Sequence, residues 1–483
     1  MTTPEGIYNA LNPNPPVVVA VLLMGVATVV LPRKYALFPL FIVASYITLG
    51  QYVVIASANF TMVRILVVFG LARALVRSDH ASVVPNGLDK AMIAWAAAAI
   101  ITYTILWQSG HAFINRVGMC FDTAGVYLVC RLYCNDTEDV NRILRLCAVL
   151  LIPLAIAMAI EFRTGKNLFS FLGGVPLASE IRDGRVRCQG SFRHPILMGT
   201  FGATMLPLIV SLWWKTGKAK VLAVFGTLSC ITIVACAGSS GALMATGYGI
   251  VGLCAWPLRF RMRSVRWLMV LAIIILQFGM KAPFWYVLAR LSSLTGGTGW
   301  HRAYLIDQAI RYFGEWWFVG TRVTAHWMPT GLLIDPTKAD ITNQYLVQGV
   351  NGGIITMLLF IAVVAIGFAA VGRTVRILES EDFSNRIVVW SMGSALFAHA
   401  ISFISVSYFD QIQVFWYFLM AAIAISLDHA KAVEAHETGN VQRVRIGAAF
   451  AGRSGMACSS LGQGTVSDPG RTRFGATAQT SNY

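Results

Sequence analysis

The run Ile143-Leu-Arg-Leu-Cys-Ala-Val-Leu-Leu-Ile-Pro-Leu-Ala-Ile-Ala-Met-Ala-Ile160 indicates which kind of protein this chain forms. As an α-helix it rises about 27 Å, which nearly matches the ~30 Å hydrocarbon core of a bilayer. Comparable apolar runs recur almost from one end of the 483-residue chain to the other. We therefore expect one integral, all-α membrane domain rather than several soluble domains.

The composition supports the same conclusion. Hydrophobic residues make up 56% of the chain, charged residues only 12%, and the mean hydropathy is +0.65. Soluble domains carry about 25% charged residues, so this chain has too little polar surface to cover a soluble core. The net charge of +16 comes from Lys and Arg in short loops between apolar runs, which sets membrane topology and argues against a nucleic-acid partner.

The cysteines are scattered, without a C-x-x-C pair or a Cys/His cluster of metal-binding spacing. We expect neither a metal nor a cofactor. No cleavable signal peptide is expected, because residues 1–16 lack a basic segment before the first apolar run.

The apolar runs predict about 12–13 membrane-spanning helices, which together form a membrane domain over residues 1–427. Residues 428–483 are rich in Gly, Ser, Ala and Thr, and we expect a disordered cytoplasmic tail there. The candidate spans are 17–31, 37–56, 62–76, 91–107, 117–133, 143–160, 196–214, 221–237, 242–258, 267–280, 353–371, 387–404 and 414–427.

The charges predict the topology, because loops that stay in the cytoplasm retain Lys and Arg. Alternate short loops carry these charges and should face inward, with the amino terminus outside. Two longer loops, 161–195 and 281–348, are also basic but fall on the outer face. Cationic charge kept outside needs another reason, and binding an anion is the natural one. The inward basic residues are Arg33, Lys34, Arg77, Lys90, Arg142, Arg145, Lys215, Lys218, Lys220, Arg259, Arg261, Arg263, Arg266, Arg373, Arg376 and Arg386.

The first outer loop ends in Arg185-Val-Arg187-Cys-Gln-Gly190-Ser-Phe192-Arg-His194-Pro195, which runs directly into a span. Proline is favourable at a helix start, and the free N–H groups beyond it attract an anion. The alternative is a basic stop before a membrane helix.

The second outer loop contains an amphipathic pattern over residues 300–313, followed by Trp316, Trp317 and Trp327. This pattern predicts a helix at the level of the lipid headgroups. The aromatic residues are either interfacial anchors or surfaces that stack on sugar rings, and both interpretations stay open.

Four motifs, in this order along the chain, resemble the O-antigen ligase and Wzy-type polymerase superfamily. They are Arg187-x-x-Gly190-x-Phe192-x-x-Pro195, then Ser239-Ser-Gly-Ala242, then Trp300-x-Arg302-Ala with Gly320, and finally Thr342-Asn343-x-Tyr345-Leu346 leading to Gly352-Gly353. The resemblance covers residues 143–404.

This resemblance implies a GT-C-like glycosyltransferase of the bacterial inner membrane. Such enzymes move a glycan from an undecaprenyl-diphosphate carrier to a glycan or lipid A–core acceptor on the periplasmic face, with inversion and without a metal. Membrane lipids are the other expected partners. By the same resemblance, Arg187 and Arg302 hold the diphosphate, and guanidinium forks suit phosphate oxygens.

The chain departs from the family at two positions. Thr342 stands where ligases have a histidine that activates the acceptor hydroxyl, and threonine has no useful pKa for that task. Ser240 stands where many relatives have arginine. Both departures weaken the match to a ligase and favour a polymerase or another branch.

Asp340 is our candidate for the general base, and its alternative interpretation is an ordinary helix cap. The expected catalytic residues are thus Arg187, Arg302 and Asp340. His301 and His326 are the next candidates for the base. The candidate substrate contacts are Arg185, His194, His301, Asn343 and Tyr345, with Asp307 as a weaker candidate.

Two other functions compete with a transferase. A transporter or flippase for a lipid-linked or anionic glycan would also have many spans and a basic outer vestibule. Transporters usually place ionisable residues near the bilayer midplane, whereas Asp122 is essentially the only such residue within these apolar runs. A structural scaffold does not explain the arginines in the outer loops.

Overall fold

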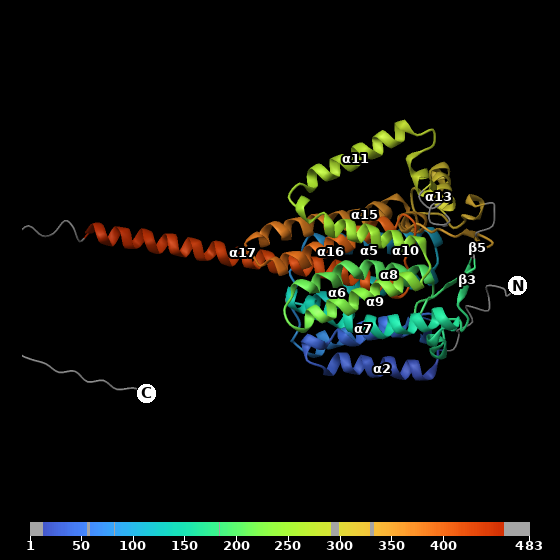
Figure 1. The fold of residues 1–483 in the computed structure, drawn as a ribbon, viewed down its shortest axis with the longest axis horizontal. Coiled ribbons are helices and arrows are strands. Elements are labelled where there is room, and N and C mark those ends of the chain that lie inside the picture. Colours follow the sequence, from blue (N-terminus) through green and yellow to red (C-terminus); the bar gives the residue numbers. More distant parts are fainter. Residues whose placement is uncertain are drawn as a thin grey trace, which may run out of the picture. The chain divides into compact units, whose positions relative to one another are not determined.

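The computed structural model describes residues 13–55, 58–81, 83–182, 184–290, 299–328 and 333–457. The chain divides into two units, Met1–Lys431 and Ala432–Tyr483. The first unit is a bundle of helices with three short antiparallel hairpins (Figure 1). The longer helices are α2 (Pro15–Val30), α3 (Phe38–Tyr46), α4 (Met62–Val76), α5 (Gly87–Trp107), α6 (Gly110–Tyr133), α7 (Thr137–Thr164), α8 (Pro195–Val210), α9 (Lys218–Cys236), α10 (Ser240–Cys254), α11 (Met262–Gly279), α13 (Gly299–Arg311), α15 (Gln344–Ile377), α16 (Phe383–Ser402) and α17 (Gln411–Ala457).

The short elements lie between these helices. The hairpins pair β1 (Tyr52–Ile55) with β2 (Ala58–Thr61), β3 (Glu180–Arg182) with β4 (Arg185–Arg187), and β5 (Leu333–Asp335) with β6 (Lys338–Ala339). The remaining short helices are η1 (Arg33–Tyr35), η2 (Leu168–Leu172), η3 (Ser211–Trp214), η4 (Trp256–Leu258), η5 (Phe284–Tyr286), α14 (Phe313–Trp316), η6 (Ala325–Trp327) and η7 (Leu378–Ser380).

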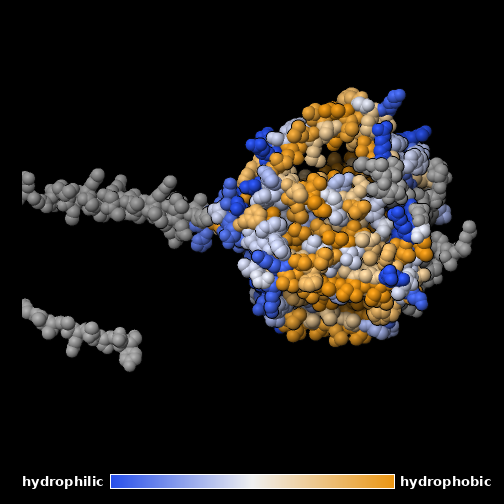
Figure 2. Space-filling model, viewed as in Figure 1, coloured by the Kyte–Doolittle hydropathy of each residue, from blue (hydrophilic) through white to orange (hydrophobic). Residues whose placement is uncertain are grey.

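Seven helices in the described part of the chain are long and apolar enough to cross a membrane: α5, α7, α8 with η3, α9, α11, α15 with η7, and α17 as far as His436. The chain is therefore an all-α, multi-pass membrane protein, as predicted. Figure 2 shows hydrophobic residues over the middle of the visible face and hydrophilic residues toward two ends. Helix α11 buries none of its residues, and Trp267 is 67% exposed, as expected of a surface that lipid covers.

Other predicted spans are shorter or more polar. Helices α4 and α10 have 15 residues and α2 has 16, against the roughly 20 of a typical spanning helix. Helix α6 is long enough but carries Arg116, Asp122 and Arg131.

The predicted bounds 37–56 are wrong, because the helix there is shorter. Helix α3 ends at Tyr46, and the chain then turns into the β1–β2 hairpin. Polar residues cause the break, because the Gln51 amide donates to Thr48 Oγ1 and to Leu172 O, both at 2.7 Å. These bonds fix the segment against η2 and prevent the helix from continuing.

The two long outer loops and the short turns between them gather at one end of the bundle. Arg193 Nη1 lies 3.3 Å from Asp410 Oδ2, Cys188 N donates to Cys236 O (3.0 Å), and Arg322 Nε donates to Leu106 O (2.8 Å). We call the described residues of 47–61, 108–109, 165–194, 237–239, 280–343 and 403–410 the loop end, which lies on the right in Figure 1.

The short basic turns meet at the opposite end. Arg33 pairs with Asp139 at 3.6 Å, and Lys215 Nζ donates to Asn385 Oδ1 at 2.7 Å. Alternate loops thus lie at opposite ends, as the charge pattern predicts. That the loop end faces outward stays a prediction.

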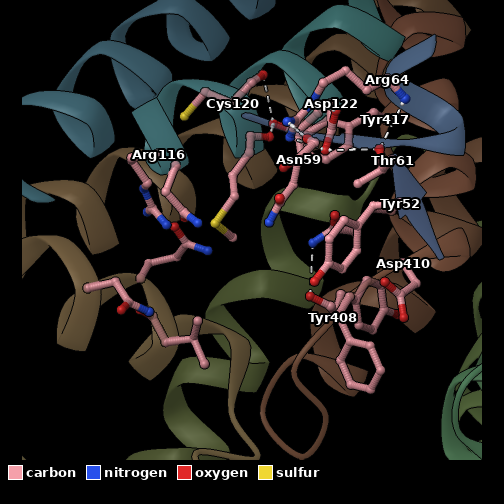
Figure 3. Close-up of a pocket in the computed structure, with 18 of the residues that line it drawn as sticks. Tyr52, Asn59, Thr61, Arg64, Arg116, Cys120, Asp122, Tyr408, Asp410 and Tyr417 are labelled. Atoms are coloured by element: carbon pink, nitrogen blue, oxygen red, sulfur yellow. Dashed lines mark hydrogen bonds and ion pairs between the residues drawn. The ribbon is translucent and has the colours of Figure 1, made fainter. Parts of the chain in front are cut away.

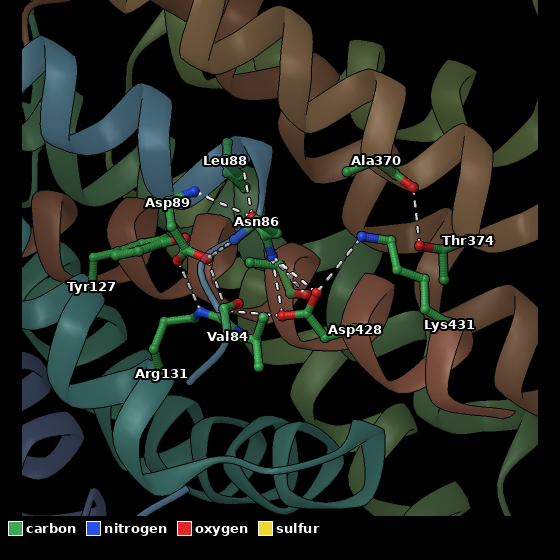
Figure 4. Close-up of polar contacts among 11 residues, drawn as sticks. Val84, Asn86, Leu88, Asp89, Tyr127, Arg131, Ala370, Thr374, Asp428 and Lys431 are labelled. Atoms are coloured by element: carbon green, nitrogen blue, oxygen red, sulfur yellow. Dashed lines mark hydrogen bonds and ion pairs between the residues drawn. The ribbon is translucent and has the colours of Figure 1, made fainter. Parts of the chain in front are cut away.

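A buried polar network ties α5, α6 and α17 together at this opposite end (Figure 4). Arg131 Nη2 bridges Asp89 Oδ2 (2.9 Å) and Asp428 Oδ2 (2.8 Å), while the Tyr127 hydroxyl donates to Asp89 Oδ1 (2.6 Å). Asn86 caps α5 and also donates to Asp428. Every charge in the network has an opposite partner, so it fixes how these three helices pack.

The predicted tail boundary at residue 427/428 lies close to the division between the two units at 431/432. The sequence predicts disorder for residues 428–483, but in the structure α17 continues through residues 428–457. Ala, Lys and Glu are frequent just after Asp428, and they favour helix. Residues 458–483 lie outside the described part.

Candidate functional site

Arg187 lies on the β3–β4 hairpin of the first long loop. The register pairs Glu180 with Arg187, and Arg187 Nη1 donates to Glu180 Oε1 at 2.7 Å. Arg187 is only 5% exposed, and its buried Nε has no acceptor among the described residues. The guanidinium is therefore held in place while part of its donor fork stays available.

The loop behind Arg187 is anchored by Glu161 at the end of α7. The Glu161 carboxylate accepts the backbone N–H groups of Gln189 (3.1 Å) and Gly190 (3.0 Å). Gly190 has φ +55°, a conformation that favours glycine, and Phe192 stacks on Phe201 of α8 at 5.2 Å. The glycine and phenylalanine of the first motif thus position Arg187 from behind.

Arg302 lies on α13, in the second long loop. Its Nε is buried, and the side chain makes no hydrogen bond or ion pair with any residue that the structure describes. Burial, reinforced by the nearby charge of Arg182, lowers the pKa of Arg302. Arg182 and Arg302 come from different loops, so the fold brings positive charges from both loops near each other.

Both arginines approach the amino-terminal end of α10. A methyl group on Gly238 would lie 3.2 Å from Arg187 Cγ, and one on Gly241 would lie 3.9 Å from Arg302 Nη2. Helix α10 begins at Ser240 without a capping side chain, so its first N–H groups are free. The helix dipole adds partial positive charge at the same place. This arrangement can bind an anion with several oxygen atoms.

Asp340 lies beside α13. Its carboxylate has no hydrogen-bond or ion-pair partner among the described residues, and His301 Nε2 lies 3.4 Å from its backbone oxygen. Burial raises the pKa of Asp340, against a smaller opposing effect of His301. Burial lowers the pKa of His301, so the imidazole is neutral near pH 7. A carboxylate with a raised pKa and no partner suits a general base.

The alternative interpretation of Asp340 as a helix cap is wrong. The N-cap of α15 is Asn343, whose Oδ1 accepts from Leu346 N at 3.0 Å. Asn343 Nδ2 donates to Ile404 O, and the Tyr345 hydroxyl donates to Ala400 O at 2.9 Å. These two candidate substrate contacts hold the start of α15 against the 400–404 segment, so a substrate would meet groups that are already bonded.

His194 and Arg185 occupy different positions. His194 caps α8, because its Nδ1 accepts from Ile196 N at 3.1 Å, which leaves the proton on Nε2. Burial lowers the pKa of His194, with a smaller raising effect from Glu180. Arg185 is exposed on β4.

The second long loop has a small core of its own. Trp316 and Trp327 are buried with Leu305, Ala309 and Val350, so neither interpretation, interfacial anchor or sugar-stacking surface, holds for these two tryptophans. Helix α13 is present as predicted, and Trp300 and Trp317 are exposed. Asp307 accepts from Trp285 Nε1 (2.7 Å) and from the Tyr286 hydroxyl, and His326 pairs with Glu315, so both side chains already have partners within this loop.

The glycines of the last two motifs interlock. Gly353 interrupts α15 with φ +72°, and Gly320 has φ +100°. A methyl group on Gly353 would lie 2.1 Å from Phe318 O, and one on Gly320 would lie 2.2 Å from Val350 O. The break exposes backbone groups of α15, which pair with the loop through Thr321 N to Val350 O (2.9 Å) and Ile354 N to Trp317 O (2.8 Å). This contact fixes the loop that carries Arg302 to α15.

The sequence did not reveal two parts of this site, Arg182 and the free start of α10. Ser239-Ser-Gly-Ala242 marked α10 only as a motif, and capping cannot be read from two serines alone. Among the described residues, no group of three or more His, Cys, Asp and Glu side chains could hold a metal ion. No protein-family model matches this sequence, and no curated protein matches it.

Proposed function

We propose that this protein is a glycosyltransferase that moves a glycan from a diphosphate-linked lipid carrier to a glycan acceptor. The observation that carries the proposal is that Arg187 and Arg302 both approach the uncapped start of α10, each with a buried, unpaired Nε. A diphosphate is a good leaving group, so such an enzyme must chiefly stabilise departing negative charge. Two guanidiniums and a helix amino terminus supply that stabilisation.

The chemical step is a single displacement at the anomeric carbon. The acceptor hydroxyl oxygen forms the new C–O bond while the bond to the diphosphate breaks, and the electron pair leaves with the diphosphate. Asp340 takes the hydroxyl proton, because its carboxylate is unpaired and its pKa is raised by burial. A single displacement inverts the anomeric configuration, and it needs no metal.

Lipid-linked glycans are presented at a membrane surface, and both arginines lie at the loop end, near the start of α10. The seven apolar helices with α2, α3, α4, α6, α10 and α16 would supply thirteen crossings in a GT-C-like domain. We place the loop end in the periplasm of a bacterial inner membrane, with undecaprenyl diphosphate as the carrier and another glycan or lipid A–core as the acceptor.

Transfer from a diphosphate-linked donor by purified protein tests the proposal. Arg187→Ala and Arg302→Ala should lower turnover about tenfold to a hundredfold, since each charged hydrogen bond contributes roughly 1.5–3 kcal/mol. Arg163→Ala and Arg311→Ala are matched controls, because both replace exposed arginines in the same two loops. If folded Arg187→Ala and Arg302→Ala proteins transfer glycan normally, the assignment is wrong and a transporter becomes the better explanation.

A further inference from the structure

A cavity lies at the loop end, between the β1–β2 hairpin, α6, the first turns of α15 and the start of α17 (Figure 3). Its volume is about 390 Å³, within the range of small-molecule sites. Neither Arg187 nor Arg302 lines it, so it is separate from the proposed diphosphate site.

Arg116 of α6 lines this cavity and is the unusual residue there. It is 7% exposed, and its guanidinium lies over the Tyr103 ring at 5.1 Å. It makes no hydrogen bond or ion pair with any described residue, and its Nε is buried without an acceptor. A buried charge without a partner is costly, so its retention beside a cavity indicates that a ligand supplies the partner.

The other charged groups in the cavity wall are compensated. Arg64 donates two hydrogen bonds of 2.8 Å to Asp122, and Asp410 pairs with Arg193. His111 lies exposed on the wall. Arg116 therefore leaves about one positive charge unmatched, which suits a single carboxylate better than a doubly charged phosphate.

The uncharged lining offers fixed hydrogen-bonding groups. Gln344 and Gln348 use their oxygens to accept from Tyr408 N (2.8 Å) and Trp95 Nε1 (3.1 Å), which leaves their NH₂ groups as donors. Asn351 donates to Val347 O, which leaves its oxygen as an acceptor. Oriented donors and acceptors beside aromatic faces match the hydroxyl groups and apolar faces of a sugar ring.

We propose that this cavity binds a sugar ring bearing a carboxylate, a uronic-acid residue of the acceptor glycan, with Arg116 on the carboxylate. That the ligand belongs to the acceptor rests on the proposed function. Gln344 of the cavity lies four residues after Asp340, and Asp410 pairs with Arg193 next to His194. A sugar here would contact the start of α15, close along the chain to the proposed base.

Equilibrium titration of the full-length purified protein, observed by ligand NMR, tests the proposal. The probes are methyl glucuronide and methyl glucoside, which differ in the carboxylate, and inorganic phosphate. Methyl glucuronide should bind at least about tenfold more tightly than methyl glucoside, which corresponds to 1.4 kcal/mol. Arg116→Gln should abolish this preference. Arg322→Gln is the matched control, because Arg322 lies over the Trp107 ring at 5.2 Å but outside the cavity, and it should keep the preference.

Several outcomes would overturn the proposal. They are no saturable binding of methyl glucuronide, equal binding of both sugars, a preference that survives Arg116→Gln, or phosphate bound as tightly as the glucuronide. Thermal unfolding without sugar excludes a purely structural role. Arg116→Gln should unfold at the same or a higher temperature, because it removes an unpaired buried charge, and a lower temperature would mark Arg116 as structural.

A failure of the proposed function can be distinguished from a failure of the cavity proposal. Arg187→Ala should keep the preference for the glucuronide, because Arg187 does not line the cavity. If that variant also transfers glycan normally, the transferase assignment fails while an acidic-sugar site remains. If it loses transfer and wild type shows no preference for the glucuronide, only the cavity proposal fails.

Discussion

At the scale of single residues, Arg187 and Arg302 differ from an ordinary buried arginine because each keeps part of its donor fork unused. Arg187→Lys and Arg302→Lys keep the positive charge but lose the planar fork that matches two phosphate oxygens. We expect both lysine variants to lower turnover by about tenfold, measured as glycan transfer. Wild-type rates in both would show that charge alone suffices.

The role of Asp340 as the base predicts how turnover depends on pH. Burial raises its pKa, so the carboxylate becomes protonated, and loses its function as a base, at a higher pH than an ordinary aspartate does. Turnover should therefore fall on the acid side at a pH above the usual range for aspartate. An acid limb at the usual value, or one that persists in Asp340→Asn, would contradict this role.

The raised pKa of Asp340 also predicts how stable the Asp340→Asn variant is. A raised pKa in the folded state means that the fold favours the neutral carboxyl, so stability from this group is lost as pH rises through its folded pKa. Asn mimics the neutral form, so Asp340→Asn should be at least as stable as wild type near pH 7 while transfer is severely impaired. Thr342→Ala should transfer glycan nearly normally, because threonine carries no proton in this step.

At the scale of elements, the break in α15 holds the loop that carries Arg302. Gly353→Ala should lower the unfolding temperature, because φ +72° costs an L-residue about 1–2 kcal/mol and the methyl group would overlap Phe318 O. Gly372→Ala in the same helix is the matched control, since nothing lies within 4 Å of its added methyl group. It should be neutral or stabilising by up to about 1 kcal/mol. Equal stability of the two variants would contradict the interlock.

At the scale of the whole molecule, the loop end should be reached from one side of the membrane. Cysteines introduced at the exposed positions Leu177 and Phe318 should react with an impermeant reagent added outside, whereas Ser78→Cys at the opposite end should not. Exposed Cys254, and Cys458, are first replaced by serine. Labelling of Leu177→Cys and Phe318→Cys from opposite sides would contradict a shared site.

Much of this arrangement could be predicted from the sequence, because hydrophobic run length fixes where helices form and basic loops fix their alternation. The tertiary partners could not. Arg116 stands just before the predicted span 117–133 and carried no prediction, because its significance lies in a missing partner that only packing shows. In the sequence Asp122 is an isolated membrane charge, whereas in the structure Arg64 of α4 pairs with it. Buried Trp316 and Trp327 looked like interfacial anchors because aromatic composition does not report burial.

The central claim is that Arg187 and Arg302, 115 positions apart, bind one diphosphate. A double-mutant cycle on the affinity of the purified protein for undecaprenyl diphosphate tests it most directly. We predict that Arg187→Ala and Arg302→Ala each weaken binding by at least about tenfold, and that the double variant loses less than the sum of the two because both contact one ligand. Strictly additive losses, or unchanged affinity in either single variant, would contradict the account.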